Sequence, residues 1–410
     1  MLDVEKSYYK AASGIFIINL FLGIPGGIGL AVLSRYLENS FGFFPANIAL
    51  SMAFIIMSLH VLCKGICSPI CGYMNDLYGR KFSVLVGGVI SLIGSLCLLF
   101  STFNILFLII LGTLIIGAGR GFFMTSFNVI AGDVGEKYRR VGHAESFADG
   151  LYLIGAILGG SSSLFLGDEM ISFFILSTLM FIVAFIIIIF ILKETKPENM
   201  EETETKFSYK SVLKHENFIP TFFYAFTVEG AESGYIATTI PILLSVIGVA
   251  ESKAALFSTF PFSIGLGLFF LIAGYVNDRK GRKLTSLLGC SLIILFSVLA
   301  AIFLNEAASE IMIFIIVFLL SGSSSFVRST IESTWTDVTS PINRGRFYGV
   351  FRFFNELGGV VHPLLMFFLT FLADLPIQVS AIIVIAFAIT SLLIGKFLFK
   401  ETLKKVKEKE

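Results

Sequence analysis

The stretch GYMNDLYGRK, residues 72–81, recurs as GYVNDRKGRK, residues 274–283, in the second half of the chain. Equivalent residues such as Asp76 and Asp278 stand 202 positions apart, about half of the 410 residues. Each copy lies between two long apolar segments. A ten-residue pattern does not recur at this spacing by chance, so the two halves are related structural units and the repeat marks the same turn in each.

The composition places both halves in a membrane. Hydrophobic residues make up 56% of the chain and charged residues only 14%, which is typical of a membrane protein. A spanning helix needs roughly 20 mostly apolar residues, and twelve segments qualify: 11–36, 46–74, 83–101, 105–131, 143–166, 170–192, 218–248, 253–276, 284–304, 311–336, 347–372 and 376–399. We therefore expect an all-α membrane protein of twelve transmembrane helices in two pseudo-symmetric six-helix bundles, residues 1–192 and 215–410, joined by a cytoplasmic loop, 193–214.

Basic residues predict the orientation. Lys and Arg gather at one set of segment ends, which includes both motif copies, the polar stretch 193–214 and the two chain termini. The opposite ends carry only Arg35 and Lys253. Because basic loops stay on the cytoplasmic side, we expect a multi-pass protein of the plasma membrane with both termini in the cytoplasm.

Several charged residues fall within the predicted spans. The basic ones are Lys64, Arg120, Arg328 and Arg352. A charge at membrane depth costs from about 2.5 to well over 10 kcal/mol, so it must be paired or hydrated. Acids within the spans can meet them: Glu145, Asp149, Glu229, Glu232, Glu332 and Glu356. The charges indicate a polar path through the bundle; the alternative is a set of closed ion pairs that fix helix registry.

This arrangement resembles the major facilitator superfamily over essentially the whole chain. The most specific mark is the family's loop motif G-x-L-A-D-R-x-G-R-K after the second span of each half. The first copy departs from it at Met74, Asn75 and Leu77, and the second at Val276 and Asn277. The resemblance implies the superfamily fold, with spans one, four, seven and ten lining a central cavity.

A second mark of the same family follows the fourth span of each half. It consists of an acidic turn and a basic residue, Asp133 with Arg140 and, 204 positions later, Asp337 with Arg344. By this resemblance the four residues belong to the gating machinery.

The loop motif also has a direct physical interpretation. Gly72 and Gly274 let two helices approach closely, and Gly79 and Gly281 permit a backbone turn that most residues resist. We expect the basic residues of the motif to sit among anionic lipid headgroups: Arg80, Lys81, Arg282 and Lys283.

The motif aspartates Asp76 and Asp278 can accept hydrogen bonds from a helix N-terminus or an arginine. The resemblance implies a latch, in which the aspartate bridges the two halves on the cytoplasmic side while the transporter is open outward. The alternative is only a tight, positively anchored turn.

The seventh span carries Glu229 and Glu232 near its middle. A spacing of three places both carboxylates on one helical face. Two such groups cannot both be charged cheaply in a poor dielectric, so one should hold a proton, as a proton-coupling site requires. Alternatively, each is tied to a neighbouring Arg or Ser and never titrates.

Two arginines reach similar depth in the fourth and tenth spans. Arg120 is flanked by glycines, which we expect to clear space around its guanidinium, and Arg328 has Glu332 one turn below it. The two could clamp a carboxylate or phosphate. Alternatively, Arg120 pairs with Asp76, and we expect Arg328 to pair with Glu332.

We therefore predict a secondary active transporter that works by alternating access, and not an enzyme. No G-x-x-x-x-G-K-[ST] nucleotide motif is present. We expect proton symport of a metabolite such as a sugar, an organic acid or an amino acid. The alternatives are a multidrug/proton antiporter and a non-transporting membrane sensor. The expected partners are a small solute, protons and the lipid bilayer, with no nucleic acid, cofactor or metal, and the protein is expected to be a monomer.

Overall fold

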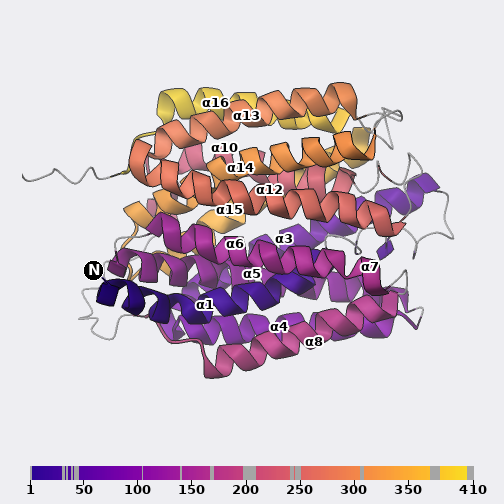
Figure 1. Cartoon of the computed structure of the whole chain (residues 1–410), viewed down its shortest axis with the longest axis horizontal. Coiled ribbons are helices and arrows are strands. Elements are labelled where there is room, and N and C mark those ends of the chain that lie inside the picture. Colours follow the sequence, from indigo (N-terminus) through magenta and orange to yellow (C-terminus); the bar gives the residue numbers. More distant parts are fainter. Residues whose placement is uncertain are drawn as a thin grey trace, which may run out of the picture.

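The computed structural model describes residues 2–29, 33, 36–37, 40, 46–103, 105–138, 141–166, 170–196, 209–240, 244, 251–304, 309–369 and 379–403. These residues form a bundle of helices that lie roughly along one axis (Figure 1). The helices are α1 (Leu2–Ile28), α3 (Ala46–Tyr78), α4 (Arg80–Ser101), α5 (Leu106–Tyr138), α6 (Val141–Ser161), α7 (Ser163–Leu166), α8 (Met170–Phe190), α9 (Tyr209–Leu213), α10 (Phe218–Glu229), η2 (Gly230–Thr239), α12 (Glu251–Lys280), α13 (Arg282–Phe303), α14 (Glu310–Val338), α15 (Arg344–Phe367) and α16 (Val379–Leu398).

Each of the twelve predicted segments contains a helix in the described part of the chain. Eight of these helices are long and apolar enough to cross a membrane: α3, α4, α5, α8, α12, α13, α14 and α16. The apolar part of α1, Ala12–Ile28, is shorter. The seventh span is divided into α10 and η2, of 12 and 10 residues, and each is too short to count by itself. Helices α6 and α15 carry charged residues, which lower their hydropathy.

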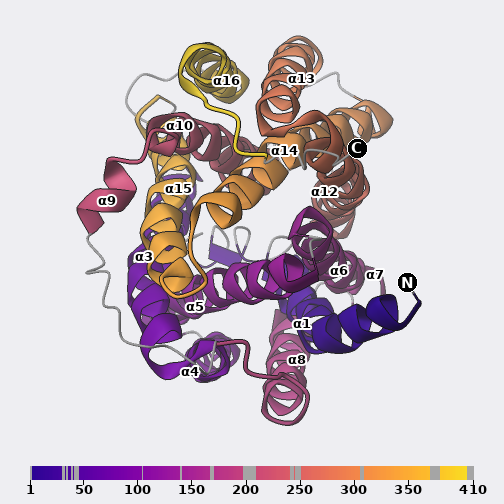
Figure 2. The same cartoon turned by 90° about the vertical axis from the view of Figure 1, so that its left-hand side faces the viewer.

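The helices divide into two groups that follow the chain. Viewed along the bundle axis, α1 to α8 form one group and α10 to α16 the other (Figure 2). The groups meet mainly through two helix pairs, α3 with α15 and α6 with α12. Glycines line the first of these contacts, since a Cβ on Gly72 would meet the backbone of Gly345, and one on Gly349 would meet Pro69. The close approach expected of Gly72 is therefore present; Gly274 is buried in α12.

Helix α10 continues without a break into the π-helix η2. Threonine hydroxyls support the wider turns: Thr238 donates to the carbonyl oxygen of Ser233, and Thr239 to that of Gly234, each five residues back. Long π-helices are rare and often mark functional sites. Glu229 ends α10 and Glu232 lies in the first turn of η2, so the change of helix type falls at the acidic pair.

The two motif copies form matching turns at the same end of the bundle, called here the motif end. Gly79 separates α3 from α4 with φ 109°, and Gly281 separates α12 from α13 with φ 103°. Residues with a Cβ rarely adopt these angles. The glycines therefore have the backbone role that the motif predicts.

Candidate functional site

Asp76 joins the two halves at the motif end. Its Oδ1 accepts the backbone N–H of Gly345 at 3.0 Å, and its Oδ2 accepts that of Arg346 at 2.9 Å. Both donors lie in the first turn of α15, in the other half of the chain. The carboxylate thus binds a helix N-terminus, where unpaired N–H groups and the helix dipole favour an anion.

Buried arginines extend this contact. Asp133 accepts from Arg80 Nε at 3.3 Å and from Arg344 Nη1 at 2.7 Å, so one carboxylate bridges the two halves. Arg344 also binds Glu136 at 2.5 Å, and Arg80 Nη2 donates to the carbonyl oxygen of Pro341 at 2.7 Å. Both arginines are fully buried.

The expectation that Arg80 and Arg282 lie among lipid headgroups is therefore wrong. Arg80 is 0% and Arg282 is 2% exposed. Nearby carboxylates explain the difference, because each guanidinium forms several charge-assisted bonds inside the protein. Lys81 stays at the surface, where its Nζ donates to the carbonyl oxygen of Ile189.

The second motif copy makes no such bridge. Asp278 binds Arg282 at 2.8 Å, and its side chain is 40% exposed. Arg282 also binds Asp337 at 3.1 Å, within the same half. In the described part of the chain, Asp278 has no bond to the first half. Arg140, the expected counterpart of Arg344, lies outside the described residues.

A second internal repeat supports both turns, and the sequence analysis missed it. Glu194 accepts the backbone N–H groups of Arg80 and Lys81 at 2.9 and 3.1 Å. Glu401 accepts those of Arg282 and Lys283 at the same two distances. Each carboxylate caps the helix that follows its motif glycine. The signal was the tripeptide Lys-Glu-Thr, which follows the last helix of each half at residues 193–195 and 400–402.

A cavity of about 760 Å³ lies between the halves, away from the motif end. Its lining combines apolar residues with eleven charged or polar side chains from both halves: Lys64, Arg120, Asn128, Asp149, Tyr152, Glu229, Glu232, Ser233, Arg328, Glu332 and Arg352. The intramembrane charges of the described residues therefore line a polar cavity between the halves.

Arg328 holds the acidic pair of the seventh span. Its Nη2 lies 2.9 Å from Glu229 Oε1 and 2.5 Å from Glu232 Oε2. Ser233 and Ser324 donate to the same two carboxylates. The pairing that the sequence favoured, Arg328 with Glu332, is not formed. The guanidinium instead reaches across to α10 and η2, where two carboxylates receive it.

A second charged cluster crosses the interface. Lys64 on α3 binds Glu356 on α15 at 2.8 Å, and Arg352 binds the same glutamate at 2.7 Å. Three of the four intramembrane bases are therefore paired.

Three acids have no such cation. Glu145 on α6 accepts from the hydroxyl of Thr336 at 2.7 Å and lies 3.2 Å from that of Tyr348, both in the other half. The carboxylates of Asp149 and Glu332 line the cavity and form no hydrogen bond or ion pair with the described residues. Glu332 is only 4% exposed.

Arg120 is the remaining base, and it lies apart from the latch. Its Nη2 donates to the hydroxyl of Tyr152 at 2.9 Å. It has no carboxylate partner in the described part of the chain, and Asp76 is occupied by α15 and Arg80. The alternative pairing of Arg120 with Asp76 is therefore not formed.

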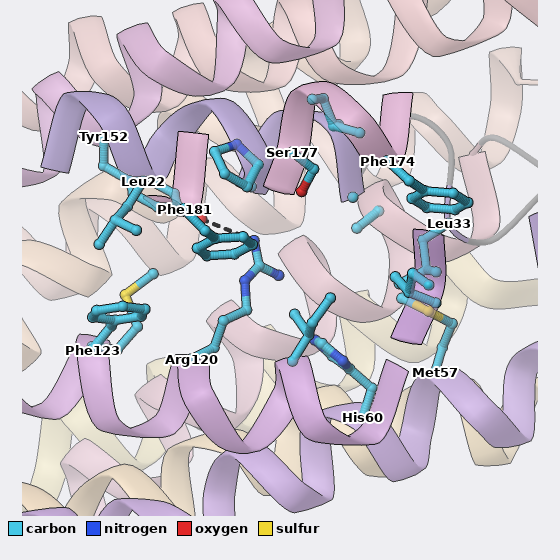
Figure 3. A pocket seen from close by; sticks show the side chains of 18 of the residues that line it. Leu22, Leu33, Met57, His60, Arg120, Phe123, Tyr152, Phe174, Ser177 and Phe181 are labelled. Atoms are coloured by element: carbon cyan, nitrogen blue, oxygen red, sulfur yellow. Dashed lines mark hydrogen bonds between the residues drawn. The ribbon is translucent and has the colours of Figure 1, made fainter. Parts of the chain in front are cut away.

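Arg120 also borders a second pocket, lined by first-half residues and by Ala237 of η2. The pocket shares four residues with the central cavity, namely Arg120, Met124, Tyr152 and Ala237, so the two spaces adjoin. Figure 3 shows the side chain of Arg120 extending into this pocket among aromatic and aliphatic residues.

Comparison with known proteins agrees with this architecture. The profile of the Major Facilitator Superfamily matches residues 12–363 and 221–410. The chain belongs to this superfamily of secondary transporters, and it is a membrane transporter rather than an enzyme. The predicted family and the predicted all-α membrane fold are thus confirmed.

A solved structure shares the fold across the chain. The crystal structure of the human organic anion transporter MFSD10 (TETRAN) superposes with a TM-score of 0.76 over 95% of this chain and 99% of that chain, at 15% sequence identity. At this identity the likeness establishes the fold alone. No curated protein matched the sequence.

Proposed function

We propose that the protein moves a small solute across the plasma membrane by alternating access and couples this movement to protons. The two halves, residues 1–192 and 215–410, would rock about the central cavity as two bodies. The bonds of Asp76, Asp133 and Arg344 between the halves support the proposal that the motif end acts as a gate. Opening that gate requires all of these bonds to break together.

The observation that carries proton coupling is the pair of carboxylates without cations, Asp149 and Glu332. They come from opposite halves and line one cavity. Two acids that share a poorly hydrated space cannot both be charged cheaply, so they favour binding a proton. Loss of that proton would separate α6 from α14 by repulsion, which links protonation to the position of the halves.

This assignment moves the coupling role from the predicted pair, Glu229 and Glu232, to Glu332 and to Asp149, which was not among the predicted coupling residues. Glu229 and Glu232 share the guanidinium of Arg328, which stabilises their charged forms. We propose that this cluster is a salt bridge that reorganises as the cavity opens, while Glu332 with Asp149 exchanges the proton.

We further propose uptake by symport, with both chain termini in the cytoplasm. The basic motif end supports this orientation. The absence of a proline beside Gly159 and Gly160, where drug–proton antiporters usually have a Gly-Pro pair, argues against the efflux alternative.

A counterflow screen in proteoliposomes tests the proposal. A transported solute should exchange without a gradient and accumulate when an inward proton gradient is imposed. Glu332→Gln should retain exchange but lose gradient-driven accumulation, because exchange needs no proton release. Glu310→Gln is the matched control, since Glu310 is exposed at the start of the same helix.

Two results would contradict the proposal. If no solute moved with or without a gradient, the result would favour the alternative of a membrane sensor that does not transport a solute. If Glu332→Gln and Asp149→Asn both kept full gradient-driven accumulation, the coupling site would lie elsewhere.

A further inference from the structure

Arg120 differs from every other intramembrane base in the described part of the chain. Lys64, Arg328 and Arg352 each bind a glutamate. The hydrogen bond of Arg120 goes instead to a neutral hydroxyl, that of Tyr152. A guanidinium does not lose its proton in proteins, so Arg120 carries a positive charge at membrane depth to which no carboxylate of the described residues is bound.

Three helices position this charge. Arg120 comes from α5, Tyr152 from α6, and Gly26 from α1. A Cβ on Gly26 would collide with the hydroxyl of Tyr152 and lie 3.0 Å from Arg120 Nη2. The space around the guanidinium is therefore provided by Gly26. The glycines beside Arg120 do not provide it, because Gly119 packs against Ser91 and Gly121 against the backbone of Lys64.

The pocket beside the guanidinium is built for an apolar body. Its lining includes four phenylalanines and several aliphatic side chains, and Figure 3 shows Phe123, Phe174 and Phe181 around the space that Arg120 enters. A ligand that fits here has an oxyanion at one end and an aromatic or aliphatic group at the other.

We infer that Arg120 and Tyr152 bind the carboxylate of a small organic anion, and that the aromatic pocket holds its apolar part. The planar guanidinium accepts a carboxylate in a two-pronged contact, and the phenol adds a third donor. Four residues line both the pocket and the central cavity, so a bound anion would lie next to the cavity that contains the proposed proton-coupling acids. The inference names the substrate class of the proposed transporter and rests on that function.

Binding to the purified protein in detergent tests the inference without any proton gradient. The probes are benzoate, phenylacetate and hexanoate, each paired with its neutral amide, together with inorganic phosphate. The readout is the ligand-induced rise in the thermal unfolding midpoint, titrated to an apparent Kd. We expect at least one of the three carboxylates to bind, and its amide and phosphate to bind at least about tenfold more weakly.

Variants then assign the site. Arg120→Gln should weaken carboxylate binding about tenfold to a hundredfold, and Tyr152→Phe about tenfold or less. Arg120→Lys should recover part of the loss, since it restores the charge without the planar fork. Arg279→Gln is the control: Arg279 is exposed, stacks on Tyr275 and should leave binding unchanged.

A second pair of variants tests the pocket geometry without removing charge. Gly26→Ala should weaken binding, whereas Gly29→Ala should not. Both glycines line the same pocket, but a Cβ on Gly29 would meet nothing within 4 Å.

Three outcomes would overturn the inference: no carboxylate binding to the wild type, equal binding of acid and amide, or unchanged binding in Arg120→Gln. Tight binding of phosphate alone would also overturn it, because it would leave the aromatic pocket without a role. These failures are distinct from failure of the proposed function. Carboxylate binding that survives in Glu332→Gln together with intact gradient-driven accumulation would refute the coupling site and leave the anion site standing.

Discussion

The two copies of the motif have the same backbone but different partners. In both copies a glycine with positive φ precedes a helix that a distant glutamate caps. Only in the first copy does the aspartate cross to the other half, where Asp76 binds the start of α15. Asp278 remains half-exposed beside Arg282. The comparison teaches that local structure is repeated by duplication, while the contact across the interface belongs to one copy.

The largest expected difference is between Asp76→Asn and Asp278→Asn. Removing the charge of Asp76 disrupts a buried network, which typically costs about 3–5 kcal/mol. Asp278 forms an exposed pair worth about 1 kcal/mol or less. We expect Asp76→Asn to lower the thermal unfolding midpoint and to slow transport about tenfold or more, and Asp278→Asn to change transport less than about twofold. Equal effects would show that the second copy also bridges the halves in another state of the cycle.

The glycine contact of the first copy gives the next effect. Gly72→Ala places a Cβ against the backbone of Gly345, so α3 and α15 must move apart. Such overpacking typically costs about 1–3 kcal/mol. Gly150→Ala is the control, because a Cβ there would meet nothing within 4 Å. The measurement is the unfolding midpoint of both variants in detergent, and an unchanged midpoint in Gly72→Ala would argue against tight closure.

The turn glycines should respond alike. Gly79→Ala and Gly281→Ala each force a Cβ into a positive-φ conformation that almost only glycine adopts, which costs about 1–3 kcal/mol. Each new Cβ would also meet the capping glutamate. Nearly equal losses in the unfolding midpoint would sharpen the comparison by showing that the turns are locally equivalent. A loss in only one variant would break that equivalence.

The capping glutamates should give the smallest effect, about 1 kcal/mol each for Glu194→Gln and Glu401→Gln. Burial raises the pKa of Glu401, but the backbone N–H groups of Leu403, Arg282 and Lys283 outweigh it and hold the pKa below the ordinary 4.5. The charged form therefore stabilises the fold above pH 4.5, and this contribution is lost as the pH falls through the lowered folded-state pKa. The difference in unfolding midpoint between the wild type and Glu401→Gln should become smaller as the pH is lowered from 7 toward 4.

The helices and their duplication could be predicted from the sequence because both depend on local composition and on a repeat. The turns at Gly79 and Gly281 and the depth of the buried charges follow for the same reason. The partners of those charges do not, since they depend on how helices far apart in the chain face one another. For example, Arg328 binds Glu229 and Glu232 on other helical segments rather than Glu332, which is only four residues away in the sequence.

Three other structural features could not be predicted because their sequence signals are too weak. The Lys-Glu-Thr repeat spans three residues, and its meaning emerges only when Glu194 and Glu401 meet the helices they cap. The π-helix η2 has no apolar period that distinguishes it from an α-helix. The space beside Arg120 comes from Gly26 on another helix, and the residues adjacent to Arg120 in the sequence do not indicate this contact.

The two compensated charge clusters of the cavity have a consequence for energetics. The Arg328 cluster carries one surplus negative charge and the Glu356 cluster one surplus positive charge, so together they are neutral. A monovalent anion that entered with one proton would add no net charge. Moving an elementary charge across 100 mV is worth about 2.3 kcal/mol. A cycle that moves no net charge is electroneutral, so the membrane potential would not contribute to its driving force. Accumulation would then follow the pH difference alone, and collapsing the voltage with potassium and valinomycin would leave it unchanged.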